Sequence, residues 1–180
     1  MDGLIALLDE KHTRLVQDLW LNLEDQCGLS ERLITPFPHF TWQVAQGYDY
    51  KNMGEKITEL TSNLSSFFVK TAGIGVFTGE MPVVFITIVK TPELLSLHQK
   101  VWSAIHPFGN GVSDHYSPEN WIPHITLASK NLSTDTLLKI FRFLGSQKIY
   151  WEIPIHQFAI GCQSDEGASV ITETYPLKGK

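Results

Sequence analysis

The sequence predicts an α+β fold of two similar lobes, and two observations carry this prediction. The pattern histidine, apolar residue, threonine, apolar residue occurs twice in the 180 residues, at positions 39–42 and 124–127. The copies lie 85 residues apart, close to half the chain, and strands and helices are expected in the same order around each. Two copies are fewer than a solenoid needs, so the pattern indicates one duplicated unit. We therefore expect pseudo-two-fold symmetry, helices on the outside and a central cleft between the lobes.

In each copy the histidine and the threonine are two residues apart. Side chains alternate between the faces of a β-strand, so His39 and Thr41 point the same way, as do His124 and Thr126. The apolar residues between and after them face the other side and can anchor each strand in a core. Each half of the chain is thus predicted to present one imidazole and one hydroxyl to the cleft.

The first half begins with strand, helix and motif strand. A short apolar run at residues 4–8 predicts a buried strand, and Asp9 is placed to cap the helix that follows. Apolar residues at helical spacing, ended by Gly28, place this helix at roughly residues 10–27. A stiff stretch containing two prolines leads into the motif strand, which is expected at residues 39–45.

A second helix and two strands follow. Asn52 and Glu55 resemble a capping box, and apolar residues at helical spacing continue the helix as far as Phe68. A strand is expected at residues 70–77, and a turn with glycine and proline connects it to an apolar run at residues 83–89, which predicts another strand.

The same order of elements then returns. Thr91 is a good N-cap and Pro92 suits the first helical position, so a helix is expected up to Ile105. A loop at residues 108–122 precedes the second motif strand, and loops of this length inside compact domains are usually functional or mobile.

The remainder predicts one helix and two strands. Ser133 caps the helix, which ends at Gly145, and the strands are expected at residues 149–160 and 170–175. Pro154 indicates that the first of these strands has an unpaired edge or a bulge. The whole chain is expected to form a single two-lobed domain of residues 1–180, with lobes of roughly residues 1–80 and 81–180 and room for a terminal strand to cross between them.

The composition of the chain limits the kinds of partner that the protein is expected to bind. A formal net charge of −5 and only three arginines argue against a protein that grips long duplex nucleic acid, whereas a small phosphate-bearing ligand fits. The two cysteines form neither a disulfide framework nor a metal cluster, which favours a reducing compartment. No apolar run approaches the roughly 20 residues that span a bilayer, and an acid stands near the start where a signal peptide carries basic residues. We expect a cytoplasmic monomer without a membrane partner.

On these residues the chain resembles the two-histidine (2H) phosphoesterase superfamily, which includes RNA 2′,3′-cyclic phosphodiesterases and 2′-5′ RNA ligase-like proteins. The motif of that superfamily is histidine, apolar residue, threonine or serine, apolar residue, and both copies here satisfy it. The resemblance covers nearly the whole chain. It implies largely antiparallel sheets, motifs that face a central groove, and chemistry that needs no metal or other cofactor. Relatives act on cyclic nucleotides, 2′-5′-linked oligonucleotides, ADP-ribose cyclic phosphate or RNA 3′ ends, so the substrate stays open.

Two imidazoles suit the hydrolysis of a cyclic phosphodiester. One group must take a proton from water and another must give a proton to the departing ribose oxygen, and histidine's ordinary pKa near 6.5 allows both. His39 and His124 are therefore the predicted catalytic residues, with their two roles unassigned. The hydroxyls of Thr41 and Thr126 are predicted to bind the non-bridging phosphate oxygens, where charge accumulates in the transition state.

Other mechanisms lack their signatures. The sequence contains neither a His-Glu-x-x-His or Cys-x-x-Cys metal motif nor the Gly-x-Ser-x-Gly of a serine hydrolase. Two alternatives stay open: a 2′-5′ oligonucleotide phosphodiesterase or ligase-like enzyme that acts on a small nucleotide or an RNA end, and a nucleotide-binding module without catalysis.

Four further histidines are expected to be structural or solvent-exposed. His12, His98 and His106 fall on or beside predicted helices and are expected to be surface or packing residues without partners. His115 and Tyr116 lie in the long loop, where we expect solvated side chains, with contact to a nucleobase or phosphate as the alternative.

Two phenylalanines stand near equivalent strand ends of the two halves. Phe77 and Phe158 are expected in the core, because core aromatics are commoner than ligand platforms. A nucleobase stacked on one of them is the alternative. The spacing of the lysines singles out none of them for steering a phosphate.

Overall fold

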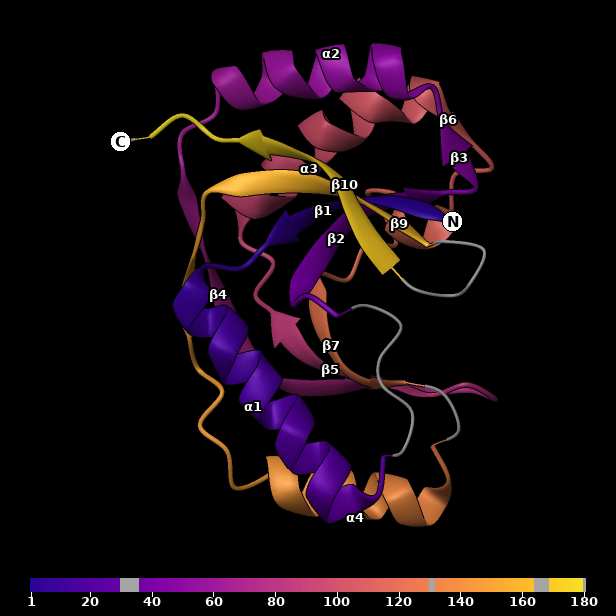
Figure 1. Ribbon diagram of the computed structural model, residues 1–180, viewed down its shortest axis with the longest axis vertical. Coiled ribbons are helices and arrows are strands. Elements are labelled where there is room, and N and C mark those ends of the chain that lie inside the picture. Colours follow the sequence, from indigo (N-terminus) through magenta and orange to yellow (C-terminus); the bar gives the residue numbers. More distant parts are fainter. Residues whose placement is uncertain (30–35, 130–131, 164–168, 180) are drawn as a thin grey trace.

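The computed structural model describes residues 1–29, 36–129, 132–163 and 169–179, which form two four-stranded antiparallel sheets and four α-helices (Figure 1). In spatial order the first sheet contains β10 (Ser169–Pro176), β9 (Gln157–Gln163), β1 (Asp2–Leu7) and β2 (His39–Ala45). The second contains β7 (His124–Ser129), β5 (Val83–Ile88), β4 (Phe67–Phe77) and β8 (Glu152–Ile155). A third, two-stranded sheet pairs β3 (Gly47–Tyr48) with β6 (Gly109–Asn110).

The duplication is visible in the connections. Helix α1 (Glu10–Cys27) joins β1 to β2, and α3 (Pro92–Ile105) joins β5 to β7 by way of the loop. In each sheet the motif strand occupies one edge, and its neighbour is β1 for β2 and β5 for β7. The edges β2 and β7 contact each other. The predicted two-lobed α+β fold with antiparallel sheets is confirmed.

The helices cover the sheets in crossed pairs. Helix α1 packs against α4 (Thr134–Leu144) and β7, whereas α2 (Tyr50–Ser62) packs against α3 and β10. Figure 1 shows the first pair at one end of the molecule and the second pair at the other. The sheets also exchange strands across the middle of the chain, since β4 joins the second sheet and β9 and β10 close the first. The division near residue 80 stays a prediction.

Several helix ends follow their local signals. Thr91 and Ser133 accept hydrogen bonds from backbone N–H groups in the first turns of α3 and α4, as expected of N-caps. Gly28 ends α1 with a φ of 71°, a left-handed conformation that glycine adopts without penalty. Asp9 precedes α1 as predicted, but its carboxylate accepts a hydrogen bond from the ring of His12 instead of a backbone N–H.

The predicted second helix is wrong at both ends. Helix α2 begins at Tyr50, because Asp49 accepts hydrogen bonds from the backbone and side-chain nitrogens of Asn52 at 3.3 and 2.6 Å. Asn52 is therefore inside the helix and is not its cap. The helix ends at Ser62, and Phe68 belongs to β4, where it pairs with β8. Two adjacent aromatic residues fit a helix or a strand equally well, and here cross-strand pairing decides.

The strand predicted at residues 149–160 is two strands. Its first part, β8, forms the edge of the second sheet, and its second part, β9, lies inside the first sheet. The chain changes sheet at His156. Pro154 does lie on an edge strand, as a residue without a backbone N–H should. A single apolar run can contribute strands to two sheets, and the periodicity of the run does not show where one strand ends and the next begins.

The apolar residues of both motifs are anchors, as predicted. Phe40, Trp42, Ile125 and Leu127 are at most 1 % exposed, and all four belong to one continuous core. Truncating such a side chain to alanine typically costs about 2–5 kcal/mol, so each motif strand is held firmly from behind. Among the described helices none is long and apolar enough to cross a membrane.

Candidate functional site

Both motif strands carry an extra residue at the same place. The pairing of β2 with β1 skips Trp42, and the pairing of β7 with β5 skips Leu127. Each skipped residue directly follows the motif threonine. Such β-bulges bend a strand and re-aim side chains, and they are common beside functional sites. Sequence reasoning missed them. Two adjacent buried residues follow the threonine in both strands, Trp42 and Gln43 in one and Leu127 and Ala128 in the other. Only the second pair is apolar at both positions, so it alone breaks the alternation in the sequence.

The four predicted site residues lie on the two contacting edges. His39 and Thr41 are on β2, His124 and Thr126 are on β7, and all four are half-buried. The two histidines lie close enough for a charge on His124 to affect His39. The structure therefore brings both pairs to one surface between the sheets, and their catalytic role remains a prediction.

The two imidazoles are held in the same way. Nδ1 of His39 lies 2.9 Å from the backbone carbonyl of Phe37, and Nδ1 of His124 lies 2.6 Å from that of Ile122. A carbonyl oxygen only accepts, so Nδ1 is the donor and carries the proton in each ring. Nε2 is then the atom that takes up or releases a proton. The partner two residues back thus fixes the tautomer of both histidines.

Burial lowers the pKa of both histidines below the ordinary value. For His39 and for His124 the loss of solvent outweighs the carbonyl hydrogen bond, which raises the pKa. Charge on His124 lowers the pKa of His39 further. Both rings are therefore mainly neutral at pH 7 in the free protein, and an anion bound between them would favour protonation of one.

Each motif strand accepts a hydrogen bond from a tryptophan indole that lies outside its own sheet. Nε1 of Trp121, just before β7, donates to the carbonyl of Thr41 at 2.8 Å. Nε1 of Trp20, on α1, donates to the carbonyl of Thr126 at 3.1 Å. An edge strand has backbone groups without ladder partners, and these two indoles satisfy one on each edge. The backbone beside both threonines is thereby held from outside its own sheet.

Aromatic rings wall one histidine. The rings of Phe77 and Phe85 each lie with their centroid 5.0 Å from that of His124. Gly75 makes room for this packing, because a Cβ there would come within 2.6 Å of the Phe85 ring. Phe77 is half-buried at the site, whereas Phe158 is fully buried in the core, as predicted. The expectation of a core position for Phe77 is therefore wrong.

Tyr116 is the site residue that sequence reasoning passed over. The loop at residues 108–122 contains short helical turns, and Tyr116 ends the one at Asp114–Tyr116. Its half-buried side chain lies near that of Thr41 on β2, while the neighbouring His115 is exposed. Burial raises the pKa of Tyr116, and the nearby Thr41 hydroxyl partly offsets this. The expectation of a solvated Tyr116 is wrong, and that for His115 is confirmed.

Two histidines expected to lack partners have them. His12 donates to the carboxylate of Asp9. His98 is 1 % exposed, its Nε2 donates to the carbonyl of Trp42 at 3.1 Å, and its ring stacks 3.8 Å from that of Trp121. Burial lowers the pKa of His98 to about 4. It is a neutral packing residue behind the first motif.

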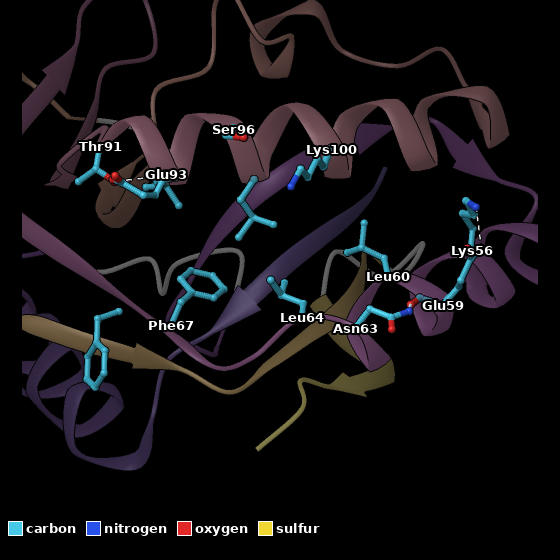
Figure 2. A pocket seen from close by; sticks show the side chains of 13 residues that line it. Lys56, Glu59, Leu60, Asn63, Leu64, Phe67, Thr91, Glu93, Ser96 and Lys100 are labelled. Atoms are coloured by element: carbon cyan, nitrogen blue, oxygen red, sulfur yellow. Dashed lines mark hydrogen bonds and ion pairs between the residues drawn. The ribbon is translucent and has the colours of Figure 1, made fainter. Parts of the chain in front are cut away.

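A groove of about 680 Å³ lies elsewhere, between α2, α3 and the start of β4 (Figure 2). Leucine and phenylalanine side chains line it together with polar and charged residues, which include two lysines and two glutamates: Lys56, Glu59, Glu93 and Lys100. None of the four motif residues lines it. This groove is therefore separate from the candidate site.

A model of the 2′-5′ RNA ligase superfamily matches residues 9–161, and the chain belongs to that superfamily. A Bacillus cereus (strain B4264) protein that bears the name "Putative phosphoesterase" is 24% identical over 143 residues, 78% of either chain.

Solved structures share the fold. TT0787 of Thermus thermophilus matches with a TM-score of 0.67 and 15% identity, over 99% of this chain and 98% of that one. Escherichia coli LigT, complexed with phosphate, matches at 0.60 and 12% identity, over 98% and 96%. Kluyveromyces marxianus Usb1 matches at 0.55 and 12% identity, over 98% and 97%.

Proposed function

We propose that the protein is a metal-independent cyclic phosphodiesterase that hydrolyses a nucleoside or RNA-terminal 2′,3′-cyclic phosphate. The observation that carries the proposal is the pair of contacting edges, each with an imidazole fixed through Nδ1 and a threonine two residues on. Membership of a phosphoesterase superfamily supports chemistry at a phosphoric diester. The phosphate held by E. coli LigT, which has the same fold, supports an anion site in this one.

The proton transfers balance with two imidazoles. The neutral ring takes a proton from water at Nε2, and the water oxygen forms a bond to phosphorus. The bond from phosphorus to one ribose oxygen breaks, and the protonated ring gives its proton to that oxygen. The product is a 2′- or 3′-phosphomonoester, and the two rings have exchanged protonation states. Proton exchange with solvent restores them.

The substrate itself supplies the charge that this mechanism needs. The pKa values of His39 and His124 are lowered in the free protein, so both rings are mainly neutral at pH 7. A phosphodiester carries a negative charge, and a nearby negative charge favours the imidazolium form. Binding therefore raises the pKa of the ring that becomes the acid. Thr41 and Thr126 donate to the non-bridging oxygens from either edge.

A second candidate is hydrolysis or ligation of 2′-5′-linked oligonucleotides, which the name of the superfamily favours. The same two proton-transfer groups would serve it. A nucleotide-binding module without turnover is the third. The fixed tautomers of His39 and His124 argue for the enzymes, because binding alone does not require Nε2 to be kept available on both rings.

A turnover screen distinguishes these candidates. Its substrates are the four nucleoside 2′,3′-cyclic phosphates, ADP-ribose cyclic phosphate and 2′-5′ oligoadenylate, with products identified by phosphorus NMR. We expect a cyclic phosphate to open to a monoester at a rate that excess EDTA leaves unchanged. Cleavage of oligoadenylate alone would establish the second candidate, and binding without turnover the third. A rate abolished by EDTA and restored by manganese or zinc would overturn the mechanism. The variant His115→Ala is the matched control, since His115 is exposed.

A further inference from the structure

The segment that contains Trp121 contacts both motifs. The indole Nε1 of Trp121 donates to the carbonyl of Thr41 at 2.8 Å. The carbonyl of the next residue, Ile122, lies 2.6 Å from Nδ1 of His124 and accepts its proton in a hydrogen bond. The carbonyl of Trp121 accepts in turn from Nζ of Lys90 at 3.0 Å, which fixes the segment to the end of β5. One dipeptide thus links the first motif to the second.

His98, on α3, contacts the bulge of the first motif. Its Nε2 donates to the carbonyl of Trp42 at 3.1 Å, so the successive carbonyls of Thr41 and Trp42 both accept from side chains outside the first sheet. Trp42 is the extra residue that the pairing with β1 skips. A bulge interrupts the ladder of backbone hydrogen bonds, and a buried carbonyl without a donor destabilises the fold. His98 and Trp121 supply the two donors.

The two donors pack as one unit. The rings of His98 and Trp121 stack with their centroids 3.8 Å apart and their planes 10° apart. The ring of Trp42 is also nearly parallel to that of Trp121, at 5.5 Å and 16°. All three side chains are at most 1% exposed. Because buried side chains are packed as densely as molecules in a crystal, a displacement of one ring displaces its neighbour.

We propose that His98 and Trp121 are positioning residues for the reaction: the stacked pair holds the bulge of the first motif and sets its alignment with the second motif. This inference rests on the proposed function for its kinetic consequence. A bulge re-aims the side chains beside it, and Thr41 directly precedes this one. Loss of either donor is therefore expected to misplace the Thr41 hydroxyl relative to His124, although neither donor touches the phosphate.

The variant His98→Phe removes one donor and keeps an aromatic ring for the stack. We expect kcat to fall about tenfold, as small displacements of reacting groups cause, with KM changed less than twofold. His98→Gln keeps an N–H group for the Trp42 carbonyl and should recover most of the loss. Rates are compared at a temperature where thermal unfolding curves show every variant folded. An unchanged kcat in His98→Phe, or an equal loss in His98→Gln, would overturn the inference.

His106→Phe is the matched control. His106 is exposed at the end of the same helix, and its ring lies 4.9 Å from that of Trp102 between centroids. The substitution therefore changes a histidine in contact with a tryptophan away from the bulge, and it should leave kcat and KM within twofold of the wild type. A loss as large as that of His98→Phe would show that any change in α3 slows the enzyme, and would overturn the inference.

Trp121→Phe tests the second donor, since it keeps a ring and removes the indole N–H. Its kcat should also fall about tenfold with KM nearly unchanged. The double variant His98→Phe/Trp121→Phe should be little slower than the slower single variant, because the two residues act through the same bulge. Losses that multiply in the double variant would show that the residues act separately, and would contradict a paired role.

Hydrogen exchange of the indole tests the pair without turnover. In protein labelled with nitrogen-15 in tryptophan, the resonance of the Trp121 indole is assigned by its absence in Trp121→Phe. Its exchange with D2O should be slow in the wild type, about tenfold faster in His98→Phe and slow again in His98→Gln, because the bulge opens more often without its second donor. An exchange rate that His98→Phe leaves unchanged would refute the inference, whatever the kinetics. The expected rates in a protein that turns over no substrate would support the paired contact while the proposed function fails.

Discussion

The two motif strands have the same backbone and different surroundings. In each, the histidine is fixed to the carbonyl two residues back, a bulge follows the threonine, and an indole caps the carbonyl of that threonine. Around the side chains the match ends. His124 lies against Phe77 and Phe85, and at the register of Phe77 the first sheet carries Gly161. Thr41 has Tyr116 beside it.

This difference suits an asymmetric substrate. A cyclic phosphate has a nucleoside on one side of phosphorus and the attacking water on the other, so the two proton-transfer groups can be alike while their neighbours cannot. We infer that duplication supplied the matched imidazoles and that later divergence placed two phenylalanines beside His124 and a tyrosine near Thr41. The predictions below test how far the halves are equal, starting with the groups that should be equal.

Substitution of either histidine should cause the largest loss of activity, and the two losses should be similar. His39→Ala and His124→Ala each remove a proton-transfer group worth about 10²–10⁴-fold, so each should abolish most turnover without unfolding the protein. The double variant should be little slower than the slower single one, because the two rings act in one step. Steady-state rates and a thermal unfolding curve for each variant provide the test. A near wild-type rate in either single variant contradicts the mechanism.

The threonines should matter less than the histidines. Thr41→Val and Thr126→Val should lower kcat by about 10–10³-fold, as removal of a transition-state donor does, with little change in KM. Both values come from the same steady-state experiment. A raised KM with unchanged kcat would reassign the hydroxyls to ground-state binding.

The pH dependence of the rate should reflect the pKa values of the two coupled histidines and not of either one alone. The base must be neutral and the acid protonated, so kcat/KM should follow a bell whose limbs belong to both rings together. Because burial lowers the pKa of both His39 and His124 in the free enzyme, the bell should be centred below the ordinary value of about 6.5. The kcat profile should lie at higher pH, since bound phosphate raises the pKa. A kcat/KM bell centred above pH 7 would show that burial does not control these rings.

Local signals predicted much of this molecule. Thr91, Ser133 and Gly28 mark helix ends through contacts within a few residues, and the alternation around His39 and His124 marks the two edges. Such features depend on residues that are close in sequence, so the sequence alone predicts them.

The features that were missed depend on partners far away. The indole of Trp20 reaches a carbonyl 106 residues on, and that of Trp121 one 80 residues back. Tyr116 meets Thr41 only because the loop folds back onto β2. Neither kind of contact produces a periodic pattern of residues in the sequence. The bulges at Trp42 and Leu127 likewise arise from pairing with another strand, which the motif itself does not encode.

The smallest predicted effect tests which side of the site, that of His124 or that of His39, binds the nucleoside. Phe77 is half-buried with its ring edge-to-face on His124, and Phe37 lies beside His39, 5.6 Å between ring centroids. Base–aromatic stacking is worth about 1–3 kcal/mol, and a half-buried platform already packed on its neighbours should contribute at the lower end. Phe77→Leu should therefore raise KM about fivefold for purine cyclic phosphates, with kcat nearly unchanged.

Phe37→Leu is the matched control, and it should leave both constants within twofold. This result would also assign the chemistry: the ribose oxygen that departs lies on the nucleoside side, so the ring beside Phe77 would be the acid and His39 the base. A larger effect of Phe37→Leu would reverse that assignment. Equal small effects of both variants would show that Phe77 and Phe85 only pack against His124 and do not receive the nucleobase.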